Sequence, residues 1–241
     1  MVFSQIDYRA LASSRQSLVF SDIDGTLMFG GQVDPRTTRL LAELRGDAVV
    51  GLATGKRLSS YNRRPIEEAE ILAVENGCVI YVGGERDPEW DSYIETAMAP
   101  VKDASTVVEA KYPTEWKERM FLVRKVSPED RERMREFQTG DVSVRFNSGD
   151  AEFFPARGGK GNAIIYVADR SGIPLERVHV AGDDDNDCGM LSVAGWPYTF
   201  HTSPPYLKLL INGTGYVTTR NGHEGTVDIL EKIRSNVKGG K

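Results

Sequence analysis

The sequence has few cysteines and no long apolar run, and these absences exclude several classes of protein. Only two cysteines, Cys78 and Cys188, and three histidines occur among 241 residues. Without paired Cys/His spacing, neither a disulfide framework nor a zinc site is expected, and we interpret both cysteines as small packing residues. No uninterrupted apolar run approaches the ~20 residues of a membrane-spanning helix. Asp7 and Arg9 stand where a signal peptide would carry its apolar stretch, so we expect a cytoplasmic protein with no membrane partner.

An excess of basic residues is also absent. The chain has 30 lysines and arginines against 35 aspartates and glutamates, a formal net charge of -5. Binding to nucleic acid requires a clustered basic excess, so no nucleic-acid partner is expected, and an anionic ligand would be held by local cations. With 40% hydrophobic and 27% charged residues, the chain can bury one large core, or a core with a smaller companion. We expect a monomer or a small homo-oligomer.

Strands alternate with helices along most of the chain. Asp34-Pro35 is typical of a helix start, with an N-cap carboxylate and a proline in the first turn, and Gly46 ends that helix. Asn76-Gly77 separates two apolar runs and predicts a hairpin-type turn. Strands are expected over 18–20, 48–53, 71–74, 78–82, 177–181, 198–200 and 216–218, and further helices over 58–69, 162–170, 205–211 and 226–233 and directly after residue 187. This alternation predicts an α/β fold with a doubly wound, mostly parallel, Rossmann-like sheet.

The pattern changes after residue 83 and resumes near residue 158. Between them we expect a strand over 120–126, a helix from Ser127-Pro128 to residue 137, and strands within 141–154. We interpret residues 84–154 as an inserted α+β cap that determines substrate specificity, and residues 1–83 and 155–241 as a catalytic core. Some cap residues are of types that stack on sugars or bind polar groups, although packing or a solvated surface is the favoured explanation for each: Trp90, Tyr112, Trp116, Lys117, Arg124 and Arg145.

Two aspartates, Asp22 and Asp24, follow the apolar run Leu18-Val19-Phe20. Gly25 allows the chain to turn sharply there, so both carboxylates are expected at the carboxyl edge of a sheet. Open α/β sheets bind ligands at that edge. Taken alone, this short motif is also compatible with a solvated turn.

Three further segments bring polar side chains toward the same edge. Thr54-Gly55 follows the strand expected over 48–53, Asp183 follows the strand expected over 177–181, and Lys160 opens a helix. A lysine at a helix N-terminus is unfavourable unless an anion lies there too. The four segments therefore predict a site for an anionic group.

These residue types are the ones that phosphoryl transfer requires: a nucleophile, a proton donor for the leaving oxygen, and positive charge. We predict that Asp22 forms an aspartyl-phosphate and that Asp24 protonates the departing alkoxide and then activates water. Mg²⁺ is the expected cation, with Asp183 as a ligand. Thr54 and Lys160 would bind the phosphoryl oxygens.

In these four ordered motifs the chain resembles the haloacid dehalogenase superfamily. Within that superfamily, Glu75-Asn76-Gly77 and Lys160-Gly161 are similar to a branch with a cap inserted between the second and third motifs, which includes the Cof-like hydrolases and the sucrose-phosphate phosphatases. The resemblance implies the following roles: Asp22 and Asp24 catalytic; Asp22, the Asp24 carbonyl and Asp183 as Mg²⁺ ligands; Thr54, Gly55, Lys160 and Asn186 near the phosphate or substrate; and Asp187 in support.

The sequence departs from the family pattern at two places. Lys56 precedes Arg57, where the second motif usually has arginine directly after its glycine, and Asp184-Asp185 stand where small residues are common. The acidic run after residue 182 also imitates a calcium loop. However, Cys188 and Ala194 replace the invariant glycine and the bidentate glutamate of that loop, so we reject an EF-hand.

The function predicted from the sequence is Mg²⁺-dependent hydrolysis of a small phosphorylated sugar or sugar conjugate, sucrose phosphate being one candidate. A phosphomannomutase-like phosphosugar mutase and a non-catalytic metabolite-binding protein remain alternatives. A carbon-halogen hydrolase is less favoured, because Asp24 provides a proton donor that such chemistry does not need.

Overall fold

Eight strands form the largest of the three sheets among residues 6–60, 67–147 and 149–239, which are the residues that the computed structural model describes. Their order is β14-β13-β12-β1-β4-β5-β6-β7, and all neighbouring pairs from β14 to β5 are parallel. The strands are β1 (Leu18–Ser21), β4 (Val49–Ala53), β5 (Ile71–Val74), β6 (Val79–Val82), β7 (Glu85–Arg86), β12 (Val178–Ala181), β13 (Trp196–Phe200) and β14 (Tyr216–Thr218). From β1 the chain builds outward through β4 and β5, and from β12 it builds the other way. The expected doubly wound, mostly parallel sheet is confirmed, and its switch point lies between β1 and β12.

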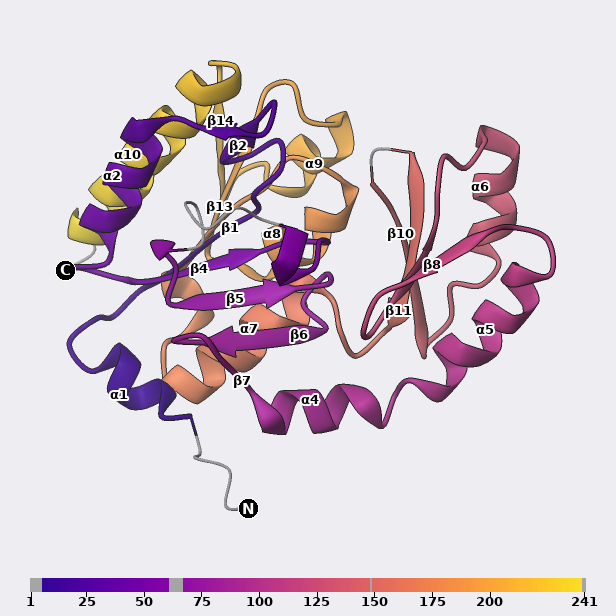
Figure 1. Cartoon of the computed structure of the whole chain (residues 1–241). Coiled ribbons are helices and arrows are strands. Elements are labelled where there is room, and N and C mark those ends of the chain that lie inside the picture. Colours follow the sequence, from indigo (N-terminus) through magenta and orange to yellow (C-terminus); the bar gives the residue numbers. More distant parts are fainter. Residues whose placement is uncertain (1–5, 61–66, 148, 240–241) are drawn as a thin grey trace.

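Helices cover both faces of this sheet (Figure 1). On one face lie α2 (Pro35–Leu44) and α10 (Gly222–Gly239), and on the other lie α1 (Tyr8–Ala12), α7 (Lys160–Ser171), α8 (Cys188–Val193) and α9 (Pro205–Leu210). Side chains of a strand alternate between faces, so Leu18 and Phe20 of β1 join one buried cluster and Val19 joins the other. All three are fully buried, which explains why this strand reads as a continuous apolar run.

The local signals in the sequence act largely as expected. Asp34 caps α2 by accepting the backbone N–H of Arg36 at 2.7 Å. β5 and β6 form the expected antiparallel hairpin, with Glu75 and Asn76 in the left-handed region at φ +52° and +55°. The helix expected over 58–69 begins as a 3₁₀ turn at Leu58–Ser60, and residue 67 is helical whereas residues 68 and 69 are not. Residues 61–66, with Pro65, lie outside the described residues, so most of that helix stays a prediction.

A smaller antiparallel sheet is inserted between β7 and α7. Its strands, in the order β10-β11-β9-β8, are β8 (Thr114–Trp116), β9 (Phe121–Val123), β10 (Val142–Asn147) and β11 (Asp150–Pro155). Figure 1 shows α5 (Ala99–Glu109) and α6 (Pro128–Arg135) on the side of this sheet that faces away from the core. Phe121 and Phe153 stack within it, with ring centroids 4.4 Å apart. We call β8–β11 together with α5 and α6 the cap. These elements have the α+β character that the sequence predicted for the insertion.

The first part of the insertion packs on the core. β7 pairs with β6, and α4 (Pro88–Glu95) places Trp90 so that its indole N–H donates to the carbonyl of Gly77 at 3.0 Å. The exact boundaries 84 and 154 therefore stay a prediction. Sequence reasoning missed α4, although Asp87-Pro88 repeats the helix-start signal of α2.

The remaining short elements connect these layers. They are the hairpin β2 (Met28–Phe29) and β3 (Gln32–Val33), and the 3₁₀ turns η1 (Leu58–Ser60), η2 (Leu175–Arg177) and η3 (Asp185–Asp187). No helix in the described ranges has both the length and the apolar character needed to cross a membrane.

Candidate functional site

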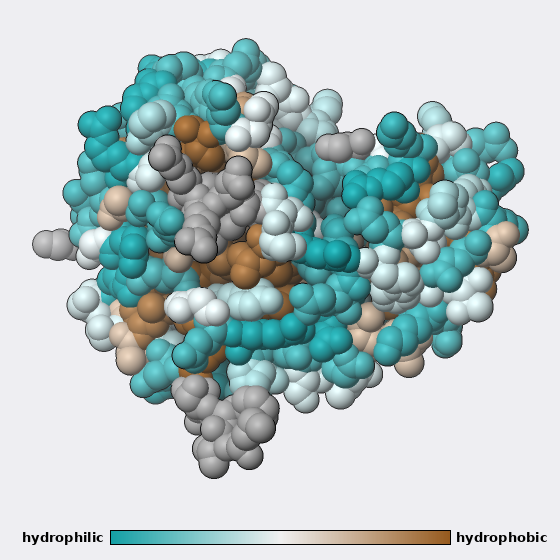
Figure 2. Space-filling view, viewed as in Figure 1, coloured by the Kyte–Doolittle hydropathy of each residue, from teal (hydrophilic) through white to brown (hydrophobic). Residues whose placement is uncertain are grey.

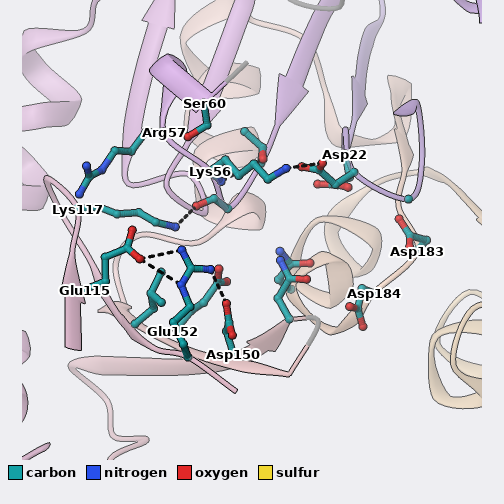
Figure 3. Close-up of a pocket in the computed structure, with 18 of the residues that line it drawn as sticks. Asp22, Lys56, Arg57, Ser60, Glu115, Lys117, Asp150, Glu152, Asp183 and Asp184 are labelled. Atoms are coloured by element: carbon teal, nitrogen blue, oxygen red, sulfur yellow. Dashed lines mark hydrogen bonds and ion pairs between the residues drawn. The ribbon is translucent and has the colours of Figure 1, made fainter. Parts of the chain in front are cut away.

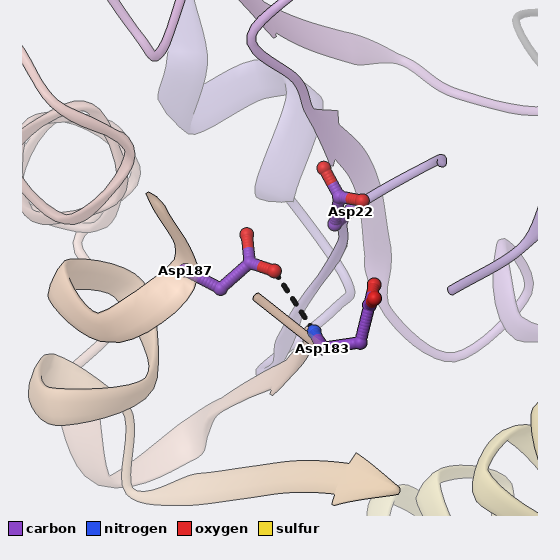
Figure 4. Close-up of side chains that lie close together, drawn as sticks. All are labelled: Asp22, Asp183 and Asp187. Carbon is purple, nitrogen blue, oxygen red and sulfur yellow. Dashed lines mark hydrogen bonds between the residues drawn. The ribbon is translucent and has the colours of Figure 1, made fainter. Parts of the chain in front are cut away.

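The loops after β1 and β12 meet at the switch point of the large sheet. Asp22 directly follows β1, and its backbone N–H donates to the carbonyl of Ala181, the last residue of β12, at 2.9 Å. Asp183 follows the same strand two residues later. Carboxylate oxygens of Asp22, Asp183 and Asp187 lie within 4.8 Å of one another (Figure 4). The sequence predicted Asp22 and Asp183 side by side, and Asp187, expected in a supporting position, lies in the same cluster.

Lys160 neutralises part of this charge. Its ammonium lies 2.5 Å from Oδ1 of Asp22 and 2.7 Å from Oδ1 of Asp187, and its side chain has no solvent exposure. Burial lowers the pKa of Lys160, but the charges of Asp187 and Asp22 outweigh burial and leave the pKa raised. Burial also raises the pKa of Asp22, and the Lys160 charge opposes that shift. Lys160 is therefore a fixed positive charge at the base of the site.

Asp187 organises the loop that carries Asp183. Its Oδ2 accepts the backbone N–H groups of Asp183 at 2.8 Å and of Asp184 at 3.1 Å, and it is fully buried. The Thr26 hydroxyl donates to Oδ1 of Asp183 at 2.5 Å. Gly25, at φ +84°, packs so closely that a Cβ there would overlap the Asp183 carboxylate. Gly25 is thus required for two reasons: its positive φ, and the lack of space for a Cβ beside Asp183.

The three carboxylates suit a divalent cation with oxygen ligands. Burial raises the pKa of Asp183 to about 7, and the neighbouring charge of Asp187 adds to the effect. Lys160 alone does not balance Asp22, Asp183 and Asp187, so a bound cation would stabilise their ionised forms. Hard cations such as Mg²⁺ prefer this donor set.

Asp24 does not join the acidic cluster through its side chain. Its Oδ1 instead lies 2.6 Å from Nζ of Lys56, and its side chain is 37% exposed. The expected metal role of Asp24 was through its main-chain carbonyl, and that role stays a prediction. Lys56, one of the departures from the family pattern, thus forms an ion pair with Asp24 of the first motif.

Thr54 and Gly55 form the next side of the site. Thr54 is buried, and its backbone N–H donates to Ala73 of β5 at 2.9 Å, which extends the parallel pairing past the end of β4. The Thr54 hydroxyl accepts the backbone N–H of Lys56 at 3.1 Å. The Gly55 carbonyl accepts a hydrogen bond from Nζ of Lys117, a cap residue, at 2.7 Å.

A cleft of about 500 Å³ lies between the core and the cap (Figure 3). From the core it is lined by Asp22, Asp24, Thr54, Asp183 and Asn186, among others, and from the cap by Glu115, Lys117, Leu122, Arg124, Asn147, Asp150 and Glu152. Figure 2 shows a largely hydrophilic surface whose outline is notched where the two parts meet. Every residue given a site role from the sequence lines this cleft, except Lys160 and Asp187, which lie beneath it.

Two of the six cap candidates line the cleft. Lys117 and Arg124 do, and Arg124 pairs with Glu115 and Asp150, each at 2.7 Å. The other four bond elsewhere: Trp90 to Gly77, Tyr112 to Asp130, Trp116 to Glu109, and Arg145 to the carbonyl of Val144. These four residues do not line the cleft, as the alternative explanation by packing or a solvated surface expects.

The sequence analysis assigned no role to three polar residues beside the cleft, which are Glu75, Asn76 and Glu152. Asn76 accepts a hydrogen bond from the side-chain amide of Asn186 at 3.3 Å and donates one to Oε2 of Glu152 at 2.7 Å. Glu75 accepts the backbone N–H groups of Glu118 and Arg119 at 3.1 and 2.8 Å. The Asn-Gly turn after a buried strand was the available signal.

The remaining departures from the family pattern connect core to cap. Arg57 donates to the carbonyl of Trp116. Oδ2 of Asp185 accepts the backbone N–H of Phe146 in β10 at 3.4 Å, and Oδ1 accepts the hydroxyl of Tyr206 at 3.2 Å. The unusual second acid of the fourth motif thus faces the cap rather than the acidic cluster.

Comparisons with known proteins agree with this geometry. A family model for haloacid dehalogenase-like hydrolases matches residues 123–230. A phosphoglycolate phosphatase of Methanopyrus kandleri is 30% identical over 233 residues, covering 92% of this chain and 98% of that protein. A putative phosphatase of Mycoplasma pneumoniae is 35% identical over 100 residues, which are 41% of this chain and 36% of that protein.

The fold has solved counterparts as well. The structure of the sucrose-phosphatase from Synechocystis sp. PCC6803, in complex with sucrose and phosphate, has a TM-score of 0.77 to this chain. The two share 20% sequence identity, and the match covers 91% of this chain and 98% of the other. At that identity the likeness concerns the fold. Together with the full-length relative, it shows that the chain belongs to the haloacid dehalogenase-like hydrolase family, among its phosphatases.

Proposed function

We propose that this protein is a Mg²⁺-dependent phosphatase that hydrolyses a small phosphorylated sugar or sugar conjugate through an aspartyl-phosphate on Asp22. One observation carries the proposal: a buried nucleophile candidate, Asp22, bonds to the ammonium group of Lys160 and lies within 4.8 Å of two further carboxylates at the base of a cleft. Such a site combines a nucleophile with local charge for a phosphate.

Each residue then has a defined task. An oxygen of Asp22 attacks phosphorus while the bond from phosphorus to the ester oxygen breaks, and Asp24 gives its proton to that oxygen. Asp24 then takes a proton from a water molecule, which attacks phosphorus and releases Asp22 and inorganic phosphate. Thr54 and Lys160 bind phosphoryl oxygens throughout. Mg²⁺, held by Asp22, Asp183 and the carbonyl of Asp24, would offset the charge of the phosphate.

The cleft supports a polyhydroxylated substrate. Its cap side presents the acceptors Glu115, Asp150 and Glu152 together with the donors Lys117 and Arg124, and a mixture of this kind matches hydroxyl groups. The named activity of the Methanopyrus kandleri relative favours a second candidate, 2-phosphoglycolate. That compound is smaller and carries a carboxylate.

The substitution Asp22→Asn tests the catalytic step. We expect it to abolish phosphate release from a panel of sugar phosphates and 2-phosphoglycolate with Mg²⁺, because an amide is a poor nucleophile, while the unfolding midpoint stays measurable and cooperative. Asp103→Asn, an exposed change on α5, is the matched control and should retain full turnover. Turnover by Asp22→Asn protein would refute the mechanism. Formation of hexose 6-phosphate from hexose 1-phosphate, instead of free phosphate, would indicate the mutase.

A further inference from the structure

Glu152 is a buried carboxylate that faces the cleft from β11 (Figure 3). It is 5% exposed, and its Oε2 accepts the side-chain N–H of Asn76 at 2.7 Å. Across residues 6–60, 67–147 and 149–239, no donor bonds to the other oxygen, Oε1. Oε1 is not among the solvent-inaccessible side-chain atoms that lack a partner, so it is accessible from the cleft that Glu152 lines. A buried acceptor with one vacant position calls for a donor from the ligand.

This vacant oxygen lies beside the loop proposed to bind phosphate. A Cβ built on Gly55, the residue after Thr54, would be 3.1 Å from Oε1 of Glu152 and 3.1 Å from Oδ1 of Asn76. Asn186 in turn holds Asn76. Glu152 is thus positioned by two core residues against the second motif, although it belongs to the cap. A group bonded to Oε1 would lie close to the phosphoryl group.

The charge of Glu152 restricts what that group is. Burial raises the pKa of Glu152, and the Asn76 hydrogen bond and the charges of Lys117 and Lys160 offset only part of that rise. A carboxylate on the substrate would bring a second acidic group against Glu152, and desolvating two such groups together is unfavourable. A hydroxyl, by contrast, donates to it directly.

We propose that Glu152 is a specificity-determining residue that accepts a hydrogen bond from a hydroxyl on the carbon next to the phosphate-ester carbon, and that it disfavours substrates with a carboxylate there. The proposal rests on the proposed function, and it selects polyol and sugar phosphates over 2-phosphoglycolate. Sites built to bond a hydroxyl reject analogues that lack it, because their buried polar group is left unpaired.

Binding of phosphonates tests this without relying on turnover. The three probes are 3,4-dihydroxybutylphosphonate, butylphosphonate and 3-phosphonopropionate, measured by calorimetry with Mg²⁺ present. We expect the wild type to bind the diol about 10- to 100-fold more tightly than butylphosphonate, and 3-phosphonopropionate most weakly. In Glu152→Gln, which keeps the shape and an oxygen for Asn76, the diol preference should fall about 5- to 10-fold and 3-phosphonopropionate should bind more tightly.

Glu136→Gln removes the same charge from an exposed position of the cap and should match the wild type. Equal wild-type affinities for the diol and butylphosphonate would overturn the proposal. An equal loss of affinity for all three probes in Glu152→Gln would also overturn it, because Glu152 would then only hold the cap against the core. If the variant does not fold, equal wild-type affinities for the diol and butylphosphonate would still overturn the proposal. Failure of the wild type to release phosphate from any ester, with the probe preference intact, would count against the proposed function alone.

Discussion

At the scale of single residues, the acidic cluster is poised for a cation. Asp22, Asp183 and Asp187 lie within 4.8 Å of one another, and the ammonium of Lys160 bonds to Asp22 and Asp187. Asp183 receives the Thr26 hydroxyl but no ammonium among the described residues. Its raised pKa follows from this arrangement, because burial and the Asp187 charge both disfavour its ionised form.

The pH dependence of stability should reveal Asp183. In the cation-free protein its pKa is about 7, against an ordinary value of 3.8, so folding favours its protonated form. Its contribution to stability is therefore complete below about pH 4 and is lost as the pH rises through 7. With EDTA, the stability of Asp183→Asn relative to the wild type should increase from pH 5 to pH 8, as followed by thermal unfolding.

Saturating Mg²⁺ should remove or reverse this trend, because a cation stabilises the ionised carboxylate that the variant lacks. Parallel curves for the wild type and Asp183→Asn in EDTA would contradict the raised pKa. Equal responses of the two proteins to Mg²⁺ would contradict the metal site.

At the scale of elements, one carboxylate joins three helices. Asp87 caps α4 by accepting the backbone N–H groups of Glu89 and Trp90, each at 2.9 Å. Its other oxygen accepts the hydroxyls of Tyr8 in α1 and Tyr166 in α7 at 2.5 and 3.2 Å. Burial and the Asp87 charge raise the pKa of Tyr8, so this hydroxyl remains a donor. The first helix of the insertion is fastened to the core by this residue.

Asp87→Asn should lower the free energy of unfolding by about 1–3 kcal/mol, because an amide nitrogen cannot accept from the two hydroxyls and leaves buried donors unpaired. Denaturant unfolding measures the change. Asp103→Asn, which removes the same charge from an exposed site on α5, should alter stability by no more than about 0.5 kcal/mol. Similar losses in both variants would show that the network contributes little.

At the scale of the whole molecule, the cap is held against the core by hydrogen bonds to main-chain groups. Glu75 of the core, 1% exposed, accepts the backbone N–H groups of Glu118 and Arg119. In the opposite direction, Lys117 of the cap donates to the Gly55 carbonyl. Because the cleft lies between the two parts, these contacts set the distance between the cap side chains and the acidic cluster of the core.

Glu75→Ala should free the two cap amides. We expect amide hydrogen exchange at Glu118 and Arg119 to accelerate about 10- to 100-fold, which corresponds to the free energy of one hydrogen bond to a charged group. We also expect KM to rise, because the cap is then held less firmly against the core. Amides of β1, measured in the same experiment, are the internal control and should exchange as in the wild type. Unchanged exchange at residues 118 and 119 would show that Glu75 does not hold the cap.

The sequence by itself determined the sheet and the residues at its edge. Buried parallel strands are continuous apolar runs, so β1, β4 and β12 were recognisable locally, and the polar residue after each strand must reach the same edge. For this reason the amino-acid pattern alone sufficed to group Asp22, Thr54 and Asp183. Helix starts with a capping acid and proline were equally local, as α2 shows.

Only the tertiary structure decided which side chains cross from one part of the chain to another. The pairing of Asp24 with Lys56, the addition of Asp187 to the acidic cluster, and the bond from Asn76 to Glu152 all join residues by distance and orientation. Local patterning carries no information on such contacts, because the angle and register at which the cap meets the core arise from packing. The grouping of polar residues at this edge of the sheet was therefore predictable from the sequence, whereas the position of Glu152, the residue proposed to select the substrate, was not.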